Sequence, residues 1–401
     1  MGLQDWKWFG SSVARRLWPL DRDRLVREAR RRTGLEDFGV PGLEPALSIL
    51  LQSLEHEAQL HSLGRLLIRI HLRDLLETRL RLAAVWQPQR AALEAACIQR
   101  PVFIVGMPRS GSTFLHELLA EDPAHRAPRV WELMFPVPSG PGGEAEKQQR
   151  IRRAAACLWW FRRLAPRADA VYPMRALTPH ECVAIHSYTF LSEEFISTCQ
   201  IPSYEQFLHT TDLTPAYQFQ QRFLQFLQLD SPTQRWVLKS PDHVHGLEEL
   251  FAVFPDAIII QTHRNPVEVL KSSADLTRVL HGLYGPKGDP DQVRVREARL
   301  LAEGTESFLQ FRDLHPHLAA RFIDVKYRDL TAQPLETLRR IYERLEEPLT
   351  PAASARIEQL AARRSRYIGP RASAESTEPS RELRLETQRF ERYCSRFDLV
   401  H

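Results

Sequence analysis

From about residue 100 onwards, short continuous apolar runs alternate along the chain with segments whose apolar residues recur at helical spacing. Short apolar runs rich in β-branched residues occur at 102–105, 236–238 and 257–260. Runs of this kind are typical of the central strands of a parallel sheet, which are buried on both faces. Between the second and third runs, apolar residues recur on one helical face: Leu247, Leu250, Phe251 and Phe254. The order of strand, helix and strand predicts an α/β domain with a central parallel sheet flanked by helices.

The first quarter of the chain has a different pattern. Leucine and isoleucine recur at helical spacing through residues 21–98, which predicts helices that bury one face. We therefore expect a helical N-terminal extension over residues 1–100 and an α/β domain over residues 101–401. Within that domain we expect a helical insertion at about 144–230 and a C-terminal helical tail.

Composition narrows the class of protein. The chain has 401 residues, 43% of them hydrophobic, which is enough for one large α/β domain with helical additions or for two domains. A net charge of +4, with arginines spread among acids, indicates no nucleic-acid partner. The five cysteines are scattered and lack C-x-x-C spacing, so we expect reduced thiols and a cytoplasmic protein. We expect no transmembrane segment, because no stretch reaches the roughly 20 apolar residues that a span needs.

Three segments carry local signals of their own. Residues 6–18 place three tryptophans among cations and predict a short surface helix that docks on the core. Proline and glycine at 136–143 predict a flexible loop. The polar segment 365–382 predicts a mobile linker before a last helix at about 383–397, and the role of this linker is not readable from the sequence.

Residues 101–114, PVFIVGMPRSGSTF, place a glycine-bracketed turn directly after the first apolar run. Gly106 and Gly111 have the spacing of the phosphate loop G-x-x-x-x-G-K-[ST], but Ser112 stands where that loop has its lysine. The amides of such a turn and the start of the following helix, near Ser112, form an anion site. Arg109 supplies charge from inside the loop, because its guanidinium matches phosphate or sulfate oxygens. The sequence therefore predicts a phosphate loop without its lysine.

On its own this pattern also fits an ordinary strand-to-helix turn, but a second block adds to it. The run at 257–260 leads into the sequence HRNP at 263–266, with the proline in the first helical turn. Arg264 is thereby expected at the carboxyl end of a strand, where open α/β sheets bind ligands. Ser272 and Ser273 follow about two helical turns later, and the sequence leaves open which of them faces the site.

The segments PRSGST at 108–113 and RNPVEVLKSS at 264–273 resemble the two nucleotide-binding signatures of the sulfotransferases that use 3′-phosphoadenosine 5′-phosphosulfate (PAPS). The strand and Y-x-D-L turn at 321–330, followed by a helix from Pro334, are also similar to the family. The resemblance spans roughly residues 100–345 and is closest to the large bacterial-type members. It implies a P-loop-like three-layer fold and transfer of a sulfuryl group to a hydroxyl or amine.

The resemblance also implies roles for individual residues. The second motif would bind the 3′-phosphate through Arg264 and Ser272. PAPS would be the co-substrate, with no metal required, and the acceptor would be a small molecule, a lipid or a carbohydrate. The first motif would wrap the 5′-phosphosulfate with Arg109, Ser110, Gly111, Ser112, Thr113 and Phe114.

Lys239 directly follows the apolar run at 236–238. Sulfuryl transfer needs fixed cations, because charge develops on the leaving and equatorial oxygens. The chain has only six lysines among its 54 basic residues, so a lysine at a strand end stands out. The resemblance implies that Lys239 stabilises the leaving phosphate or the sulfuryl group in transfer. The alternative is a solvated lysine at the edge of the sheet.

Two residues are candidates for the general base that removes the acceptor's proton. Glu132, in RVWELMF, resembles the catalytic glutamate of protein-tyrosine and related sulfotransferases. His243 lies four residues after Lys239, whereas cytosolic members of the family have a histidine two residues after the lysine, where this chain has Pro241. Either residue could be structural, and Glu132 could pair with Arg129. We place Glu132 ahead of His243.

The segment 177–195, LTPHECVAIHSYTFLSEEF, predicts a helical stretch rich in histidine and acids. His180, Glu181 and His186 lack the H-E-x-x-H spacing of a zinc site. The stretch is expected either to cap an acceptor pocket, with Phe190 and Phe195 facing an apolar substrate, or to form an amphipathic surface helix.

Two other functions compete with sulfuryl transfer. A P-loop NTPase or nucleotide kinase with a degenerate Walker A loop would need a lysine where Ser112 stands, and the strand at 258–262 has no terminal aspartate for Mg²⁺. An inactive nucleotide-binding protein would keep Arg264 and Ser272 and lose the chemistry. Titration with 3′-phosphoadenosine 5′-phosphate against ATP and Mg²⁺ distinguishes a sulfotransferase from an NTPase.

Overall fold

The computed structural model of the protein describes residues 11–39, 43–140, 142–229, 235–364 and 381–399. The chain forms two compact units, each built from separate segments of the sequence. Unit 1 consists of Met1–Cys97, Pro128–Pro232 and Asp275–Gly288, and unit 2 consists of Ile98–Ala127, Thr233–Ala274 and Asp289–His401. The linker expected at 365–382 lies outside the described residues except for its last two positions, and so do the first two of the tryptophans in 6–18.

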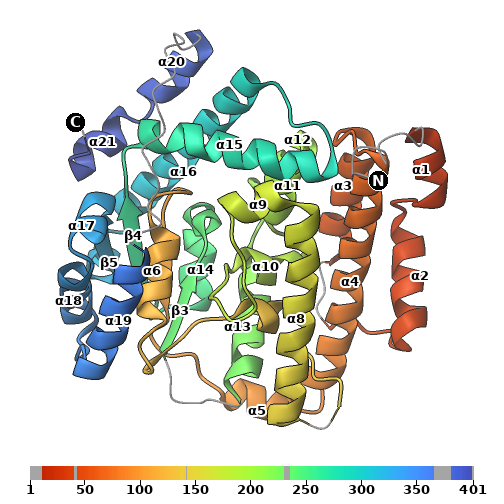
Figure 1. Ribbon diagram of the computed structural model, residues 1–401, viewed down its shortest axis with the longest axis horizontal. Coiled ribbons are helices and arrows are strands. Elements are labelled where there is room, and N and C mark those ends of the chain that lie inside the picture. The colour runs from red at the N-terminus through yellow and green to blue at the C-terminus, as the bar shows by residue number, and fades with distance from the viewer. Residues whose placement is uncertain (1–10, 40–42, 141, 230–234, 365–380, 400–401) are drawn as a thin grey trace. The chain divides into compact units, whose positions relative to one another are not determined.

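A five-stranded parallel sheet forms the centre of unit 2, and Figure 1 labels its strands β3, β4 and β5. The strand order is β2-β3-β1-β4-β5, with β1 in the middle and Phe103 opposite both Leu238 of β3 and Ile259 of β4. The strands are β1 (Val102–Val105), β2 (His125–Arg126), β3 (Arg235–Lys239), β4 (Ile258–His263) and β5 (Phe322–Lys326). The predicted α/β fold with a central parallel sheet is confirmed. The strand order reverses at β1, because β3 lies on one side of it and β4 on the other. Open α/β sheets usually bind ligands at such a point.

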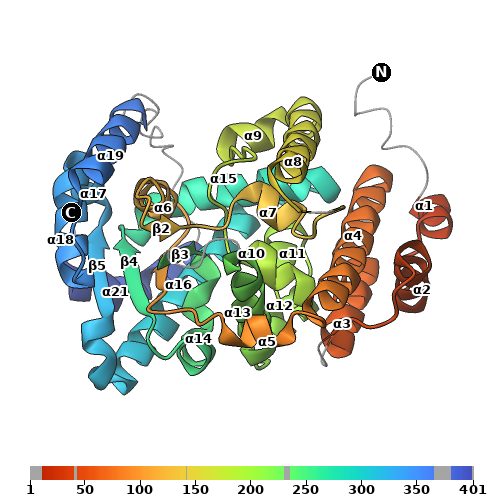
Figure 2. The ribbon, with the colours of Figure 1, turned by 90° about the horizontal axis from the view of Figure 1, so that it is seen from below.

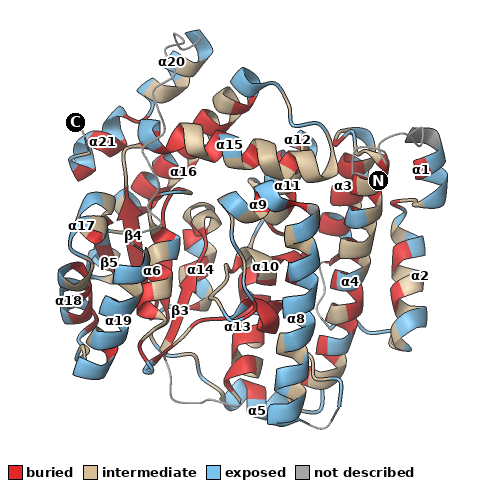
Figure 3. Cartoon of the chain, in the orientation of Figure 1, coloured by how far each residue is buried: buried red, intermediate tan, exposed pale blue. Residues whose placement is uncertain are grey.

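Helices cover both faces of this sheet. One face packs on a core to which β1 contributes Val102 and Ile104, together with residues of α6, α18 and α19. Phe103 points to the other face, where its ring lies 5.3 Å from that of Phe254. The helices of unit 2 are α6 (Ser112–Leu119), η3 (Pro241–His245), α14 (Leu247–Val253), α16 (Pro290–Leu314), η4 (Pro316–Arg321), α17 (Tyr327–Ala332), α18 (Pro334–Leu345), α19 (Pro351–Arg364), α20 (Arg381–Gln388) and α21 (Glu391–Phe397). Figure 3 shows the strands as buried and the outer helical faces as exposed.

The segment 321–330, expected as a strand and a Y-x-D-L turn, divides after Lys326. β5 ends at Lys326, which pairs with His263, the last residue of β4. Tyr327 then begins α17, because the partner strand has ended and no further ladder bonds are available to the chain. α15 (Pro266–Tyr284) begins at the predicted proline and contributes residues to both units.

Unit 1 is helical. α2 and α4 lie side by side in Figures 1 and 2, and the side chains of Arg69 on α4 and Glu28 on α2 form an ion pair. None of the helices among the described residues is long and apolar enough to cross a membrane. The helices are α1 (Ser11–Leu17), α2 (Arg22–Thr33), α3 (Leu43–His56), α4 (Ser62–Trp86), α5 (Arg90–Ala95), α7 (Val130–Met134), α8 (Glu144–Leu164), α9 (Pro166–Val171), α10 (Val183–His186), η2 (Ser187–Thr189), α11 (Glu194–Thr198), α12 (Pro202–Leu208) and α13 (Thr214–Gln228).

The continuous helix expected over 177–195 is wrong. Only α10 and η2 form within it, and α11 begins at Glu194. Phe190 has a φ of 58°, in the left-handed region, which ends η2. Phe190 and Phe195 are buried and stack with their ring centroids 6.2 Å apart, so they pack within the core of unit 1 and form no exposed apolar face.

Candidate active site

The loop between β1 and α6 is held tightly against the end of β4. Ser110 is buried, and its hydroxyl lies 2.6 Å from both the carbonyl oxygen of Met107 and Oγ1 of Thr262. Gly106 has a φ of 139°, and a methyl group on it would lie 2.5 Å from Oγ1 and 2.7 Å from the carbonyl oxygen of Thr262. Arg109 also takes a left-handed conformation, with a φ of 67°. The loop thus has the strained backbone that is common where a chain wraps a ligand.

Replacing Gly106 by alanine is expected to lower the free energy of unfolding by about 1–3 kcal/mol, because the new Cβ meets backbone as well as side-chain atoms and φ is unfavourable. Gly140→Ala is the matched control, since a Cβ at Gly140 meets nothing within 4 Å. Urea unfolding of both variants measures the difference. Equal stability of the two would show that the loop relaxes without cost.

The two arginines singled out by the sequence lie next to each other in unit 2. Arg264 donates from Nη1 to the carbonyl oxygen of Arg109 at 3.1 Å. Arg109 in turn donates from Nε to Oγ of Ser272, also at 3.1 Å. The guanidinium of Arg264 lies over the ring of Tyr327, 4.2 Å from its centroid, and its Nε donates to Glu268 at 3.1 Å. Residues about 155 positions apart in the sequence therefore form one basic cluster at the carboxyl end of the sheet.

The choice that the sequence left open between Ser272 and Ser273 has a structural answer. Ser272 contacts Arg109, whereas Ser273 is buried and its hydroxyl lies 3.1 Å from Oε2 of Glu297 on α16. The two side chains leave α15 in different directions, as successive residues on a helix do. Ser272 is the serine that belongs to the basic cluster.

Lys239 ends β3 beside the phosphate loop. It is only 2% exposed, and its Nζ donates to Oγ1 of Thr113, at the start of α6, at 3.2 Å. The next residue, Ser240, is fully buried, and its hydroxyl has no hydrogen-bond partner among the described residues. A cation so far from water needs anionic or strongly polar neighbours.

The two candidate bases lie in different surroundings. Glu132 is in unit 1, near the start of α7, and its carboxylate accepts a hydrogen bond from the backbone N–H of Arg129 at 2.8 Å. The contact with Arg129 is therefore made through its backbone, as in a helix cap. His243 is in unit 2, fully buried in η3, with its ring edge-on to that of Phe103 at 5.1 Å.

Three residues that hold the loop or the basic cluster were not predicted from the sequence. Tyr327 lies beneath Arg264, and a Cβ on Gly111 would come within 2.9 Å of its ring. Glu268 pairs with Arg264, and Thr262 holds Ser110. Tyr327 could have been predicted as a site residue, because it directly follows a strand at the carboxyl edge of the sheet. Its contact with Arg264 could not be predicted from the sequence.

A polar network that includes the buried His263 adjoins Arg264. His263 contacts Oδ1 of Asp324 through Nε2 at 2.8 Å and the hydroxyl of Tyr393 through Nδ1 at 2.7 Å, and Arg312 donates two hydrogen bonds to Asp324. Burial lowers the pKa of His263. The hydrogen bond to Asp324 acts in the opposite direction but is the smaller effect. Because the carboxylate only accepts, Nε2 donates to it and the neutral ring accepts from Tyr393. The network fixes α21 to the residue that precedes Arg264.

This network predicts acid sensitivity. Burial alone would raise the pKa of Asp324 above 3.8, but hydrogen bonds from His263 and Arg312, and the charge of Arg312, lower it to about 2. A lowered carboxyl pKa contributes stability that is complete above the unfolded value and is lost as pH falls through the folded value. Urea unfolding from pH 7 to pH 2 is expected to show a smaller loss below pH 4 for Asp324→Asn than for the wild type. Parallel curves would contradict this.

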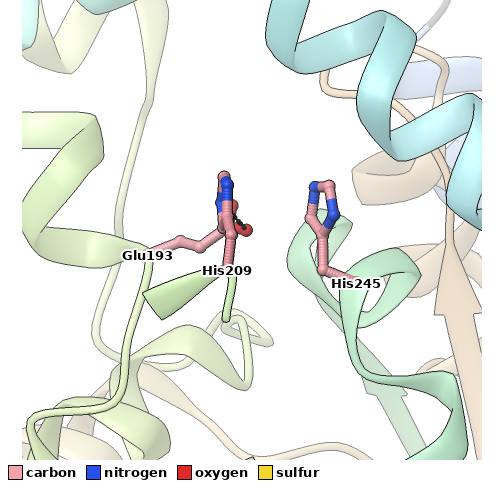
Figure 4. Close-up of side chains that lie close together, drawn as sticks. All are labelled: Glu193, His209 and His245. Atoms are coloured by element: carbon pink, nitrogen blue, oxygen red, sulfur yellow. Dashed lines mark ion pairs between the residues drawn. The ribbon is translucent and has the colours of Figure 1, made fainter. Parts of the chain in front are cut away.

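Glu181 and His186, which the sequence places near each other, have separate partners. Glu181 accepts from the hydroxyl of Tyr172 at 3.0 Å, and Nε2 of His186 lies 2.8 Å from Gln220. Burial lowers the pKa of His186 to about 4. Figure 4 shows a different pair in unit 1, Glu193 and His209, whose Oε1 and Nε2 atoms are 3.7 Å apart; His245, also drawn there, belongs to unit 2.

The parallel sheet, the loop after its central strand and the cations at its carboxyl edge define a protein of the P-loop-like α/β class. The sequence profile of the sulfotransferase family matches residues 101–351. This is more than half of the chain, and the protein belongs to the sulfotransferase family.

Three similar proteins come from mycobacteria. The chain is 27% identical over 282 residues to the omega-hydroxy-beta-dihydromenaquinone-9 sulfotransferase Stf3 of Mycobacterium bovis, a match that spans 64% of this chain and 65% of that protein. The crystal structure of sulfotransferase STF1 from Mycobacterium tuberculosis superposes with a TM-score of 0.81 and 29% identity, covering 92% of this chain and 98% of the other. Sulfotransferase STF9 from Mycobacterium avium also reaches 0.81, with 26% identity and coverage of 95% and 97%.

Proposed function

We propose that the protein transfers the sulfuryl group of PAPS to a hydroxyl or amine of its acceptor. The acceptor oxygen or nitrogen forms a bond to sulfur while the bond from sulfur to the bridging phosphate oxygen breaks. The acceptor's proton passes to a base, and 3′-phosphoadenosine 5′-phosphate leaves. The observation that carries the proposal is the cluster of Arg109, Arg264 and Ser272 beside a phosphate loop without its lysine.

Two anionic groups on one nucleotide fit two cationic positions in unit 2. The loop residues, from Arg109 to Phe114, and the start of α6 would bind the 5′-phosphosulfate. Arg264 and Ser272 would bind the 3′-phosphate. Tyr327 and Glu268 hold the plane of the Arg264 guanidinium from two sides, which supports a bidentate contact to a phosphate.

We propose that Lys239 acts on the group in transfer. Its Nζ contacts Thr113 in the first turn of α6, so it shares the loop with the proposed 5′-phosphosulfate position. The bridging oxygen gains charge as the bond to sulfur breaks, and a fixed cation stabilises it. We infer that no metal ion is needed, because side-chain cations neutralise this charge.

The name of a relative supports one class of acceptor. The similar Stf3 is named for a hydroxylated menaquinone, a lipid. We therefore propose a lipophilic hydroxyl compound as the first acceptor to test, ahead of phenols, amines and carbohydrates. Incubation of the protein with ³⁵S-labelled PAPS and each acceptor measures transfer. Failure with every acceptor, together with binding of ATP and Mg²⁺ in preference to 3′-phosphoadenosine 5′-phosphate, would favour an NTPase instead.

Arg264→Ala is expected to weaken binding of 3′-phosphoadenosine 5′-phosphate by about 1.5–3 kcal/mol, the scale of a hydrogen bond to a charged group. Binding of adenosine 5′-phosphosulfate, which lacks the 3′-phosphate, should barely change. Calorimetric titration of both ligands measures the difference. Arg264→Lys keeps the charge without the planar fork and should give an intermediate loss. Equal weakening of both ligands would assign Arg264 to another part of the nucleotide.

A further inference from the structure

The outer face of α8 in unit 1 exposes two adjacent tryptophans. Trp159 is 44% exposed and Trp160 is 59% exposed, and their rings meet edge-on with centroids 4.7 Å apart. Arg152, Ala156 and Arg163 are also exposed and lie on the same face, because they stand three, four or seven residues from one of the tryptophans. Figure 3 shows much of α8 as exposed. Large aromatic side chains in water are uncommon without a partner.

The opposite face of α8 accounts for its place in the fold. Ala154 and Leu158 are buried there in a small core with Trp131 of α7. Arg150 lies over the ring of Trp131 at 4.8 Å and donates to the carbonyl oxygens of Phe135 and Pro136. The helix is therefore held by its inner face, and folding does not require the tryptophans of its outer face.

Charge on this segment has one sign. From 147 to 168 the chain has seven cations and no acid: Lys147, Arg150, Arg152, Arg153, Arg162, Arg163 and Arg167. Lys147 and Arg150 pair with glutamates in the first turn of α8. The other five make no ion pair with any acid among the described residues, and Arg163 instead lies over the ring of Trp159 at 5.3 Å. Elsewhere in unit 1, arginines such as Arg69 and Arg73 pair with acids.

We propose that the outer face of α8 binds the surface of an anionic lipid bilayer. Tryptophan side chains are favoured at the level of the lipid headgroups, where the ring is apolar and the indole N–H meets water. Unpaired arginines attract anionic headgroups and hold the helix in the plane of the interface. A helix with a basic and aromatic face, no acid on that face and too little apolar character to span a bilayer has the features of an interfacial helix. The inference does not depend on the proposed sulfuryl transfer, but a membrane-bound enzyme would meet a lipophilic acceptor where it is dissolved.

The test is flotation of the intact protein with vesicles of phosphatidylcholine, with and without phosphatidylglycerol. We expect binding only to the anionic vesicles, and we expect it to weaken as salt is added. Trp159→Ser/Trp160→Ser is expected to weaken binding by about tenfold or more, and Arg152→Gln/Arg163→Gln by roughly 25-fold, at about fivefold for each arginine. Because these side chains are exposed, thermal unfolding should be nearly unchanged in both variants.

Matched controls distinguish binding by the outer face of α8 from nonspecific binding by other exposed side chains. Leu314→Ser removes an exposed apolar side chain from unit 2, where Leu314 is 73% exposed, and should leave binding unchanged. Arg90→Gln/Arg339→Gln removes the same charge from two other helices, α5 and α18, and should have a small effect. The proposal is overturned if vesicle binding is absent, if it is insensitive to the tryptophan variant, or if a single-stranded oligonucleotide binds this face and the vesicles do not.

Discussion

Lys239→Ala is expected to lower kcat by about 100- to 1,000-fold while raising the KM for PAPS far less, the loss typical of removing one fixed donor from a developing anion. The reason is that the proposed partner of Nζ, the bridging oxygen, gains charge only as its bond to sulfur breaks. Ground-state binding draws instead on Arg109 and Arg264. Steady-state kinetics with varied PAPS measures both parameters.

Lys326→Ala is the matched control. Lys326 also ends a strand of the same parallel sheet, but its Nζ pairs with Asp398 at 2.9 Å and its side chain is partly exposed. Its loss should leave kcat unchanged. An intact kcat in Lys239→Ala, with only a raised KM, would remove Lys239 from the transition state and leave it a ground-state anion contact. Thermal unfolding of both variants shows whether the fold is kept, because Lys239 is buried.

Glu132→Gln is expected to lower kcat by about 100- to 10,000-fold with nucleotide affinity nearly unchanged, if Glu132 is the general base. Glutamine is the informative substitution, because its side-chain oxygen can still accept the hydrogen bond that Glu132 takes from the backbone of Arg129. The start of α7 should therefore stay capped, and stability should hardly change. Glu132→Ala removes both functions and should also lower the free energy of unfolding by about 1 kcal/mol.

His243→Asn completes the comparison. Because His243 is fully buried against Phe103, its replacement is expected to reduce stability more than turnover. Loss of turnover with intact stability and affinity would instead make His243 the base. Near-full turnover in both Glu132→Gln and His243→Asn would place the base elsewhere, and His180, Glu181 and His186 would be the next residues to replace.

Local patterns in the sequence determined the secondary structure around the site and the class of the protein. The apolar run at 102–105 is β1, the phosphate-loop helix begins at Ser112 as predicted, and Pro266 begins α15. These signals work because strand burial, turn glycines and helix-start prolines act within a few residues. Over 177–195 the prediction of one helix was wrong. The local pattern favoured a helix, but burial of Phe190 and Phe195 in the core of unit 1 accompanies a break after η2.

Only the tertiary structure decided which side chains meet. Arg109 contacts Ser272 across 163 positions of sequence, and it does so because β1 and β4 are neighbours in the sheet. The same strand order puts Tyr327, after β5, against Arg264, after β4. Lys239 reaches Thr113 because β3 lies on the other side of β1. Strand order depends on how whole layers of helices and sheet pack together, and no short stretch of sequence contains that information. The sequence therefore predicted the site residues, but only the strand order determined which of them contact one another.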